Sequence, residues 1–175
     1  MVKVLCIAGS ARPDSYSTQA LRALIQAAGE KNCELVRLAD VKIEHCDGSN
    51  VCMDKGECWK KDDMDGLLTK CRKADAIVLA SPTYYSNVSG LLKDFIDRCL
   101  PAYYDGGLKG KVGLSIVAEQ VEGAMLASKC IGEYFRHHGM VSAGELMLRN
   151  KFDDTDRAAV EAAAKTLLAM VNMSR

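Results

Sequence analysis

The sequence predicts an α/β protein built in three layers, with a parallel β-sheet between two layers of helices. Five short apolar segments of strand length alternate with longer segments in which apolar residues recur every three or four positions. Such alternation is typical of a parallel sheet whose strands are joined by right-handed crossovers. The 175 residues contain no repeat and no low-complexity linker, so we expect one domain spanning residues 1–175.

The expected strands are the most apolar segments of the chain. Val2–Ala8 is almost continuously apolar, which indicates a strand buried on both faces. The later strands are expected at Cys33–Leu38, Ala76–Ala80, Val112–Ala118 and Val141–Leu148. Residues at about 40–61 separate the second strand from its helix and form a cysteine-containing insertion loop.

Each expected helix carries an apolar stripe on one face. In the third helix the stripe runs from Val88 through Phe95 to Cys99 at helical spacing. The second helix opens at Asp62 with several acids, which are favourable at the positive end of a helix dipole. The other helices are expected at Ser17–Ala28, Glu122–His138 and Asp154–Asn172.

The balance of charge argues against several classes of function. Lys and Arg together number 23, and so do Asp and Glu. The chain therefore has no excess of positive charge that would favour binding to nucleic acid or to an anionic membrane. No apolar run approaches transmembrane length, and the N-terminus is typical of a strand rather than a signal peptide, so a cytoplasmic location is expected. Five single cysteines are interpreted as small buried hydrophobic residues in a reducing compartment: Cys6, Cys33, Cys71, Cys99 and Cys130.

The turn after the first strand has the composition of a phosphate-binding loop. Gly9 allows a sharp exit from the strand, and hydroxyl side chains and Arg12 precede the next helix, whose N–H groups and dipole favour a phosphate. The chain has no Gly-x-Gly-x-x-Gly and no Walker lysine, which disfavours dinucleotide binding and P-loop chemistry. An N-cap cluster with a surface arginine is the alternative. The candidate binding residues in this turn are Ser10, Arg12, Ser17, Thr18 and Gln19.

A second candidate loop follows the third strand and leads directly into an amphipathic helix. In a parallel sheet, loops at the carboxyl ends of strands hold the ligand. Two tyrosines in this loop can cover a flat aromatic ring, while hydroxyl, amide and backbone groups can hydrogen-bond its polar edges. An ordinary solvated loop is the alternative. The residues concerned are Pro82, Thr83, Tyr84, Tyr85, Ser86 and Asn87.

Residues 81–98 resemble a segment of the flavodoxin-like NAD(P)H-dependent FMN reductases, particularly the iron–sulfur flavoprotein and WrbA branches. The family pattern Ser-Pro-Val/Thr-Tyr-Phe, Val-Ser, Leu-Lys-x-Phe-Ile-Asp-Arg corresponds to Ser81–Tyr85, Val88-Ser89 and Leu92–Arg98. The turn after the first strand is similar to the family's Gly-Ser-x-Arg loop, which grips the FMN phosphate. The resemblance covers residues 1 to about 150 and implies a flavodoxin-like three-layer α/β/α fold with strand order 2-1-3-4-5.

The resemblance implies an FMN-dependent enzyme that takes electrons from NADH or NADPH and passes them to a quinone, a free flavin, a metal ion or a protein. Because the flavin carries the chemistry, no side chain is assigned as catalytic. The family's third flavin loop falls on Ala118, Glu119 and Gln120, where side chains replace a glycine-rich stretch. A homodimer or tetramer is expected by analogy.

Two other functions use the same residues. A non-enzymatic electron-transfer flavoprotein would bind FMN without reacting with pyridine nucleotide. Cys6 to Arg12 also fits the Cys-x5-Arg loop of low-molecular-weight tyrosine phosphatases, in which a thiolate attacks phosphorus. However, Cys6 lies inside the apolar run before Gly9, and the chain has no Asp-Pro pair to supply the general acid of that family.

The insertion loop carries the remaining cysteines, Cys46, Cys52 and Cys58. Iron–sulfur flavoproteins have a Cys-x2-Cys-x2-Cys motif and a fourth cysteine here, and the resemblance places Ser49 at the second position. Because a [4Fe–4S] cluster usually needs four thiolates, we do not expect one. Zinc bound through His45 and the three cysteines is also disfavoured, because the close Cys-x2-Cys spacing is missing. We interpret the loop as a variant that covers the flavin or a dimer interface.

Overall fold

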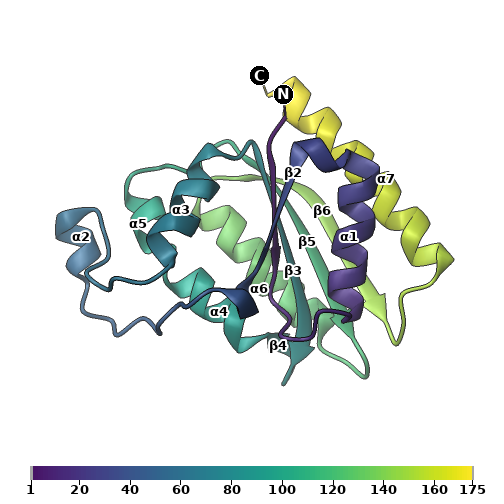
Figure 1. Cartoon of the computed structure of the whole chain (residues 1–175), viewed down its shortest axis with the longest axis horizontal. Helices are drawn as coiled ribbons and strands as arrows, with labels where there is room; N and C mark the ends of the chain where they lie inside the picture. The colour runs from purple at the N-terminus through teal and green to yellow at the C-terminus, as the bar shows by residue number, and fades with distance from the viewer. Residues whose placement is uncertain (1, 175) are drawn as a thin grey trace.

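The computed structural model describes residues 2–174, which form a three-layer α/β/α fold (Figure 1). Five parallel strands lie side by side in the order β2-β1-β3-β5-β6. Numbered along the chain as parallel strands alone, this is the expected order 2-1-3-4-5, which is confirmed. The strands are β1 (Val4–Ala8), β2 (Cys33–Arg37), β3 (Ala76–Tyr84), β5 (Val112–Glu119) and β6 (Val141–Arg149).

Helices cover both faces of the sheet. α1 (Tyr16–Ala28) and α7 (Asp154–Met173) pack together on one face. The other face is covered by α3 (Met64–Lys73), α4 (Gly90–Asp97), α5 (Leu100–Tyr104) and α6 (Ala124–His137), and 3-10 turns η1 (Glu30–Asn32) and η2 (Leu38–Asp40) flank β2. No helix within residues 2–174 is long and apolar enough to span a membrane. The carboxyl ends of the parallel strands meet at the lower edge of the sheet in Figure 1.

A sixth, short strand departs from the expectation. β3 continues past its expected end at Ala80 to Tyr84, and β4 (Asn87–Val88) pairs with it in antiparallel fashion. Tyr85 and Ser86 form the connecting turn with φ angles of 49° and 58°. A two-residue hairpin of type I′ requires such positive φ values and usually contains glycine or asparagine at these positions. The usual sequence signal is absent here, so the hairpin was not predicted.

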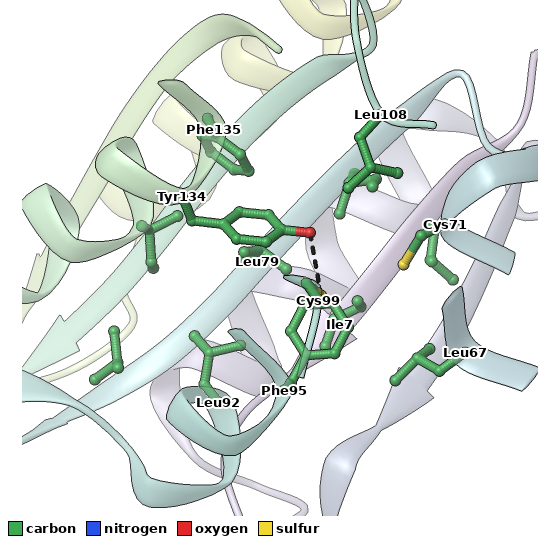
Figure 2. Packing of buried hydrophobic residues seen from close by; sticks show 14 of the residues in the cluster. Ile7, Leu67, Cys71, Leu79, Leu92, Phe95, Cys99, Leu108, Tyr134 and Phe135 are labelled. Carbon is green, nitrogen blue, oxygen red and sulfur yellow. Dashed lines mark hydrogen bonds between the residues drawn. The ribbon is translucent and has the colours of Figure 1, made fainter. Parts of the chain in front are cut away.

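The buried side chains between the sheet and α3–α6 form an apolar cluster around Tyr134 (Figure 2). The hydroxyl of Tyr134 donates to Sγ of Cys99 at 3.5 Å, and the ring lies near Phe95 and Phe135. Burial raises the pKa of the Cys71 thiol to about 12, which is typical of an inert, packed cysteine. Among the five single cysteines, Cys6, Cys71 and Cys99 are buried as expected, while Cys33 and Cys130 are partly exposed.

A buried ion pair anchors the insertion loop to the body of the protein. Arg98, which follows α4, donates from Nη1 and Nη2 to the Asp62 carboxylate at 2.8 and 3.1 Å, and both side chains are almost fully buried. Nη1 also donates to the Glu44 carbonyl at 2.7 Å. The Asp62 carboxylate accepts the N–H groups of Glu44 and Met64 as well. These bonds hold the two ends of the insertion loop together. The short helix α2 (Val51–Lys55) lies at the end of the loop that is farthest from the sheet (Figure 1).

Candidate functional site

Three loops at the carboxyl edge of the sheet meet around a cavity of about 150 Å³. Its walls are the turn after β1, the end of β3 and the residues that end β5. The residues alone indicated the first two of these segments, and the family resemblance indicated the third. The residues that line the cavity are Arg12, Ser15, Tyr16, Ser17, Pro82, Thr83, Tyr84, Ala118, Glu119 and Gln120.

The first wall is the N-terminus of α1. Ser15 is the N-cap, and its hydroxyl accepts the N–H of Thr18 at 3.2 Å. The same oxygen lies 2.8 Å from the Thr18 hydroxyl and 3.2 Å from the Ser17 hydroxyl. Within residues 2–174 the N–H groups of Tyr16 and Ser17 have no hydrogen-bond acceptor. Free N–H groups, hydroxyls and a positive helix end therefore converge beside Arg12, and this donor set suits a phosphate.

Ser89, the N-cap of α4, joins the first two walls. Its hydroxyl donates to the Gly9 carbonyl at 2.6 Å and accepts the N–H of Leu92, while its own N–H donates to Oγ of Ser81 at 2.9 Å. A Cβ atom on Gly9 would lie 2.9 Å from Cβ of Leu92 and 3.1 Å from the Ala80 carbonyl oxygen. The absence of a side chain at Gly9 thus lets the phosphate loop approach the end of β3 closely.

The second wall is the end of β3. Thr83 and Tyr84 line the cavity, and the half-exposed ring of Tyr84 supplies a flat apolar surface at its mouth. Tyr85, at the tip of the hairpin, is fully exposed and lies outside the cavity. Oδ1 of Asn87 accepts the N–H of Val88 at 2.8 Å.

The third wall ends in Glu119, a buried carboxylate that is fully engaged by the protein. Oε2 accepts the N–H of Ala124 and Oε1 accepts Nε of Arg149, each at 2.8 Å. The Ala124 N–H, and then the Arg149 guanidinium, hold the pKa of Glu119 below its usual value. Glu119 is therefore an ionised structural group rather than a proton donor or acceptor at neutral pH.

The cavity brings together most of the predicted binding residues, but not all of them. Ser15 and Tyr16 line it and were not predicted, although the position of Ser15 directly before a helix was a recognisable N-cap signal. Gln19 lies outside and donates to the Asp14 carbonyl at 2.7 Å. The predicted residues that lie beside the cavity rather than in its wall are Ser10, Thr18, Gln19, Tyr85, Ser86 and Asn87.

A model of the NADPH-dependent FMN reductase family matches residues 2–153 of the chain. The chain belongs to this family. Membership makes it an FMN-dependent flavoprotein oxidoreductase and confirms the resemblance that was based on residues 81–98.

Two archaeal iron–sulfur flavoproteins are relatives of this family member. That of Methanocaldococcus jannaschii is 34% identical over 148 residues, covering 82% of this chain and 77% of the relative. One from Archaeoglobus fulgidus is 41% identical over 118 residues, covering 66% of this chain and 54% of the relative. A solved WrbA-like flavodoxin of Agrobacterium tumefaciens superimposes with a TM-score of 0.69 at 16% identity, over 100% of this chain and 98% of that one, and therefore has the same fold.

The structure argues against the phosphatase hypothesis. Cys6 is fully buried in β1 and does not line the cavity. Hydrogen bonding to Cys33 and then burial raise the pKa of the Cys6 thiol well above its usual value. A cysteine nucleophile needs the opposite, an accessible thiol with a lowered pKa.

The insertion loop of this family member does not supply the four thiolates of a [4Fe–4S] cluster. Ser49 stands at the missing position, and its hydroxyl accepts Nε1 of Trp59 at 3.1 Å. Among residues 2–174, no three Cys, His, Asp or Glu side chains are arranged to hold a metal ion. Three thiols and an engaged hydroxyl do not fit the usual donor set of such a cluster. The loop adds no residue to the cavity wall, and its role as a cover for flavin or a dimer interface stays a prediction.

Proposed function

We propose that the chain binds FMN in the cavity at the carboxyl edge of the sheet, and that NADH or NADPH reduces the bound FMN there. The observation that carries this proposal is the meeting of three loops, far apart in the sequence, around one cavity. The phosphate would lie at the N-terminus of α1, beside Arg12, Ser15 and Ser17. The flavin ring would lie along Pro82–Tyr84, with its polar edge toward Ala118–Gln120.

The residues of the site are suited to binding and orientation rather than to proton transfer. Glu119, the carboxylate in the cavity wall, is already bonded to Ala124 and Arg149. Bound FMN would supply the hydride-accepting chemistry, and the chain would hold the phosphate and place the ring at the surface. The cavity of about 150 Å³ is smaller than the roughly 300–1,000 Å³ of an enclosed ligand pocket. Bound FMN would therefore be only partly enclosed, and the outer part of its ring would be accessible to an electron donor and acceptor.

An accessible flavin suits an acceptor that approaches from solution, such as a quinone, a free flavin, a metal ion or a protein. The aromatic side chains of Tyr84, which lines the cavity, and Tyr85, at the tip of the adjoining hairpin, are exposed. A second copy of the chain could cover them, and we include a homodimer or tetramer in the proposal.

The test begins with purified protein titrated with FMN under anaerobic conditions. Binding is followed by quenching of flavin fluorescence, and reduction by loss of visible flavin absorbance on adding NADH or NADPH. The proposal requires saturable binding and reduction by at least one nucleotide. Failure to bind FMN would overturn it.

A non-enzymatic electron-transfer flavoprotein is the second candidate. It is favoured by relatives that are described as iron–sulfur flavoproteins rather than as reductases. Tight FMN binding with no reduction by either nucleotide, but with reversible reduction by dithionite, would favour this candidate over the first.

A further inference from the structure

Glu119 and Arg149 lie opposite one another at the ends of the last two strands of the sheet. They are register partners in the β5–β6 ladder, and the Asn150 N–H donates to the Glu119 carbonyl at 2.9 Å. Both Nε and Nη2 of Arg149 lie 2.8 Å from Oε1 of Glu119. The Glu119 side chain is 7% exposed and that of Arg149 is 69% exposed, so the guanidinium closes over the carboxylate from the solvent side.

The other carboxylate oxygen of Glu119 closes the loop between β5 and α6. Oε2 accepts the N–H of Ala124, the first residue of α6, and so spans residues 120–123. A negatively charged carboxylate is favourable at the N-terminus of a helix, which is the positive end of the helix dipole. Glu119 therefore caps α6 by accepting the N–H of its first residue.

The same loop is packed against the hairpin that ends the second wall. Gly123 has a φ of 103°, and a Cβ atom there would lie 2.5 Å from Cα of Ser86. Displacement of residues 120–123 would therefore move both the β5 wall and the turn beside Tyr84. Since Glu119 and Gln120 line the cavity, the position of this loop sets the shape of two of the three walls.

We propose that Arg149 is a positioning residue for the flavin site, which holds the 119–124 loop in place and neutralises the carboxylate that lines the cavity. This inference rests on the proposed binding of FMN. Without the guanidinium, the negative charge of Glu119 in the cavity wall would be offset only by the Ala124 N–H and the N-terminus of α6. That charge would oppose binding of an anionic cofactor and would oppose the addition of electrons to a ring bound beside it.

The proposal is tested with Arg149→Met, Arg149→Lys and the double variant Glu119→Gln/Arg149→Met. Arg136→Met is the matched control, because Arg136 also pairs with a glutamate, Glu133, but lies on α6 away from the cavity. The measurements are the FMN dissociation constant, the midpoint potential of bound flavin, and urea unfolding to verify that each variant is folded.

Arg149→Met is expected to raise the FMN dissociation constant about tenfold and to make the midpoint potential more negative. Arg149→Lys, which keeps the charge but not the forked contact, should restore the potential and only part of the affinity. The double variant should return the potential to the parent value while the affinity stays weakened, because the charge is removed but the loop is not held.

Values for Arg149→Met that equal those of Arg136→Met would overturn the proposal. A double variant whose potential stays as low as that of Arg149→Met would overturn the charge-neutralising role. If the parent protein does not bind FMN, the proposed function itself fails. That outcome is distinct from a parent that binds FMN and an Arg149 variant that binds it equally well.

Discussion

Asp62→Ala should destabilise the folded protein more than Arg98→Met, although both substitutions break the same buried ion pair. Without Asp62, the guanidinium of Arg98 keeps the Glu44 carbonyl and an interaction with the Cys58 side chain but loses its carboxylate, and its buried Nε has no hydrogen-bond partner even in the parent. Without Arg98, the Asp62 carboxylate still accepts the N–H groups of Glu44 and Met64. The Arg98 charge left by Asp62→Ala is thus more poorly stabilised than the Asp62 charge left by Arg98→Met.

The magnitudes follow from this asymmetry. Loss of one partner from a buried pair costs about 3–5 kcal/mol, which we expect for Asp62→Ala. Loss of a charged hydrogen bond whose acceptor keeps other donors costs about 1.5–3 kcal/mol, which we expect for Arg98→Met. Burial opposes ionisation of Asp62, but hydrogen bonds from Arg98 and the backbone lower its pKa overall. The stabilisation is therefore present above the ordinary carboxyl pKa and is lost as the pH falls through the lower, folded-state value.

The assay is urea unfolding at neutral pH, followed by circular dichroism, with the same variants repeated toward acid pH. Arg136→Met serves as the control, because its ion pair with Glu133 is exposed and should contribute little. Equal destabilisation by Asp62→Ala and Arg98→Met, or a loss below about 1 kcal/mol for Asp62→Ala, would refute the reasoning. The Asp62→Ala variant should also lose less stability than the parent between neutral and acid pH.

The remaining predictions concern the cofactor and the assembly. Arg12→Ala should weaken FMN binding by about 1.5–3 kcal/mol in a fluorescence titration, and unchanged affinity would contradict the assigned phosphate site. Purified protein should contain flavin without stoichiometric iron, and Ser49→Cys should increase iron incorporation on anaerobic reconstitution. Iron analysis near four atoms per chain in the parent would contradict this expectation. Light scattering at micromolar concentration should show a dimer or tetramer, and a monomer would remove the oligomer prediction.

The order of the elements and the position of the site could be predicted because they depend on local sequence. Apolar periodicity reports which face of each segment is buried, and parallel strands place their carboxyl ends at one edge of the sheet. The hydroxyls around Ser17 and the Pro82–Tyr84 segment follow apolar runs of strand length, so two of the cavity walls were found from the residues, while the third, Ala118–Gln120, came from the family resemblance. The Ser15 N-cap was also readable but was overlooked.

The roles of Arg98, Glu119 and Arg149 were decided only by the tertiary structure. Arg98 and Asp62 are 36 residues apart and Glu119 and Arg149 are 30 apart, and no local pattern reports which distant charges will meet. The β3–β4 hairpin also escaped prediction, because Tyr85 and Ser86 adopt positive φ without the usual glycine or asparagine. Packing of Gly123 against Ser86 accompanies this turn. Local sequence thus determined which segments form the site, whereas long-range packing determined which side chains remain free to bind a ligand and which are already bonded within the protein.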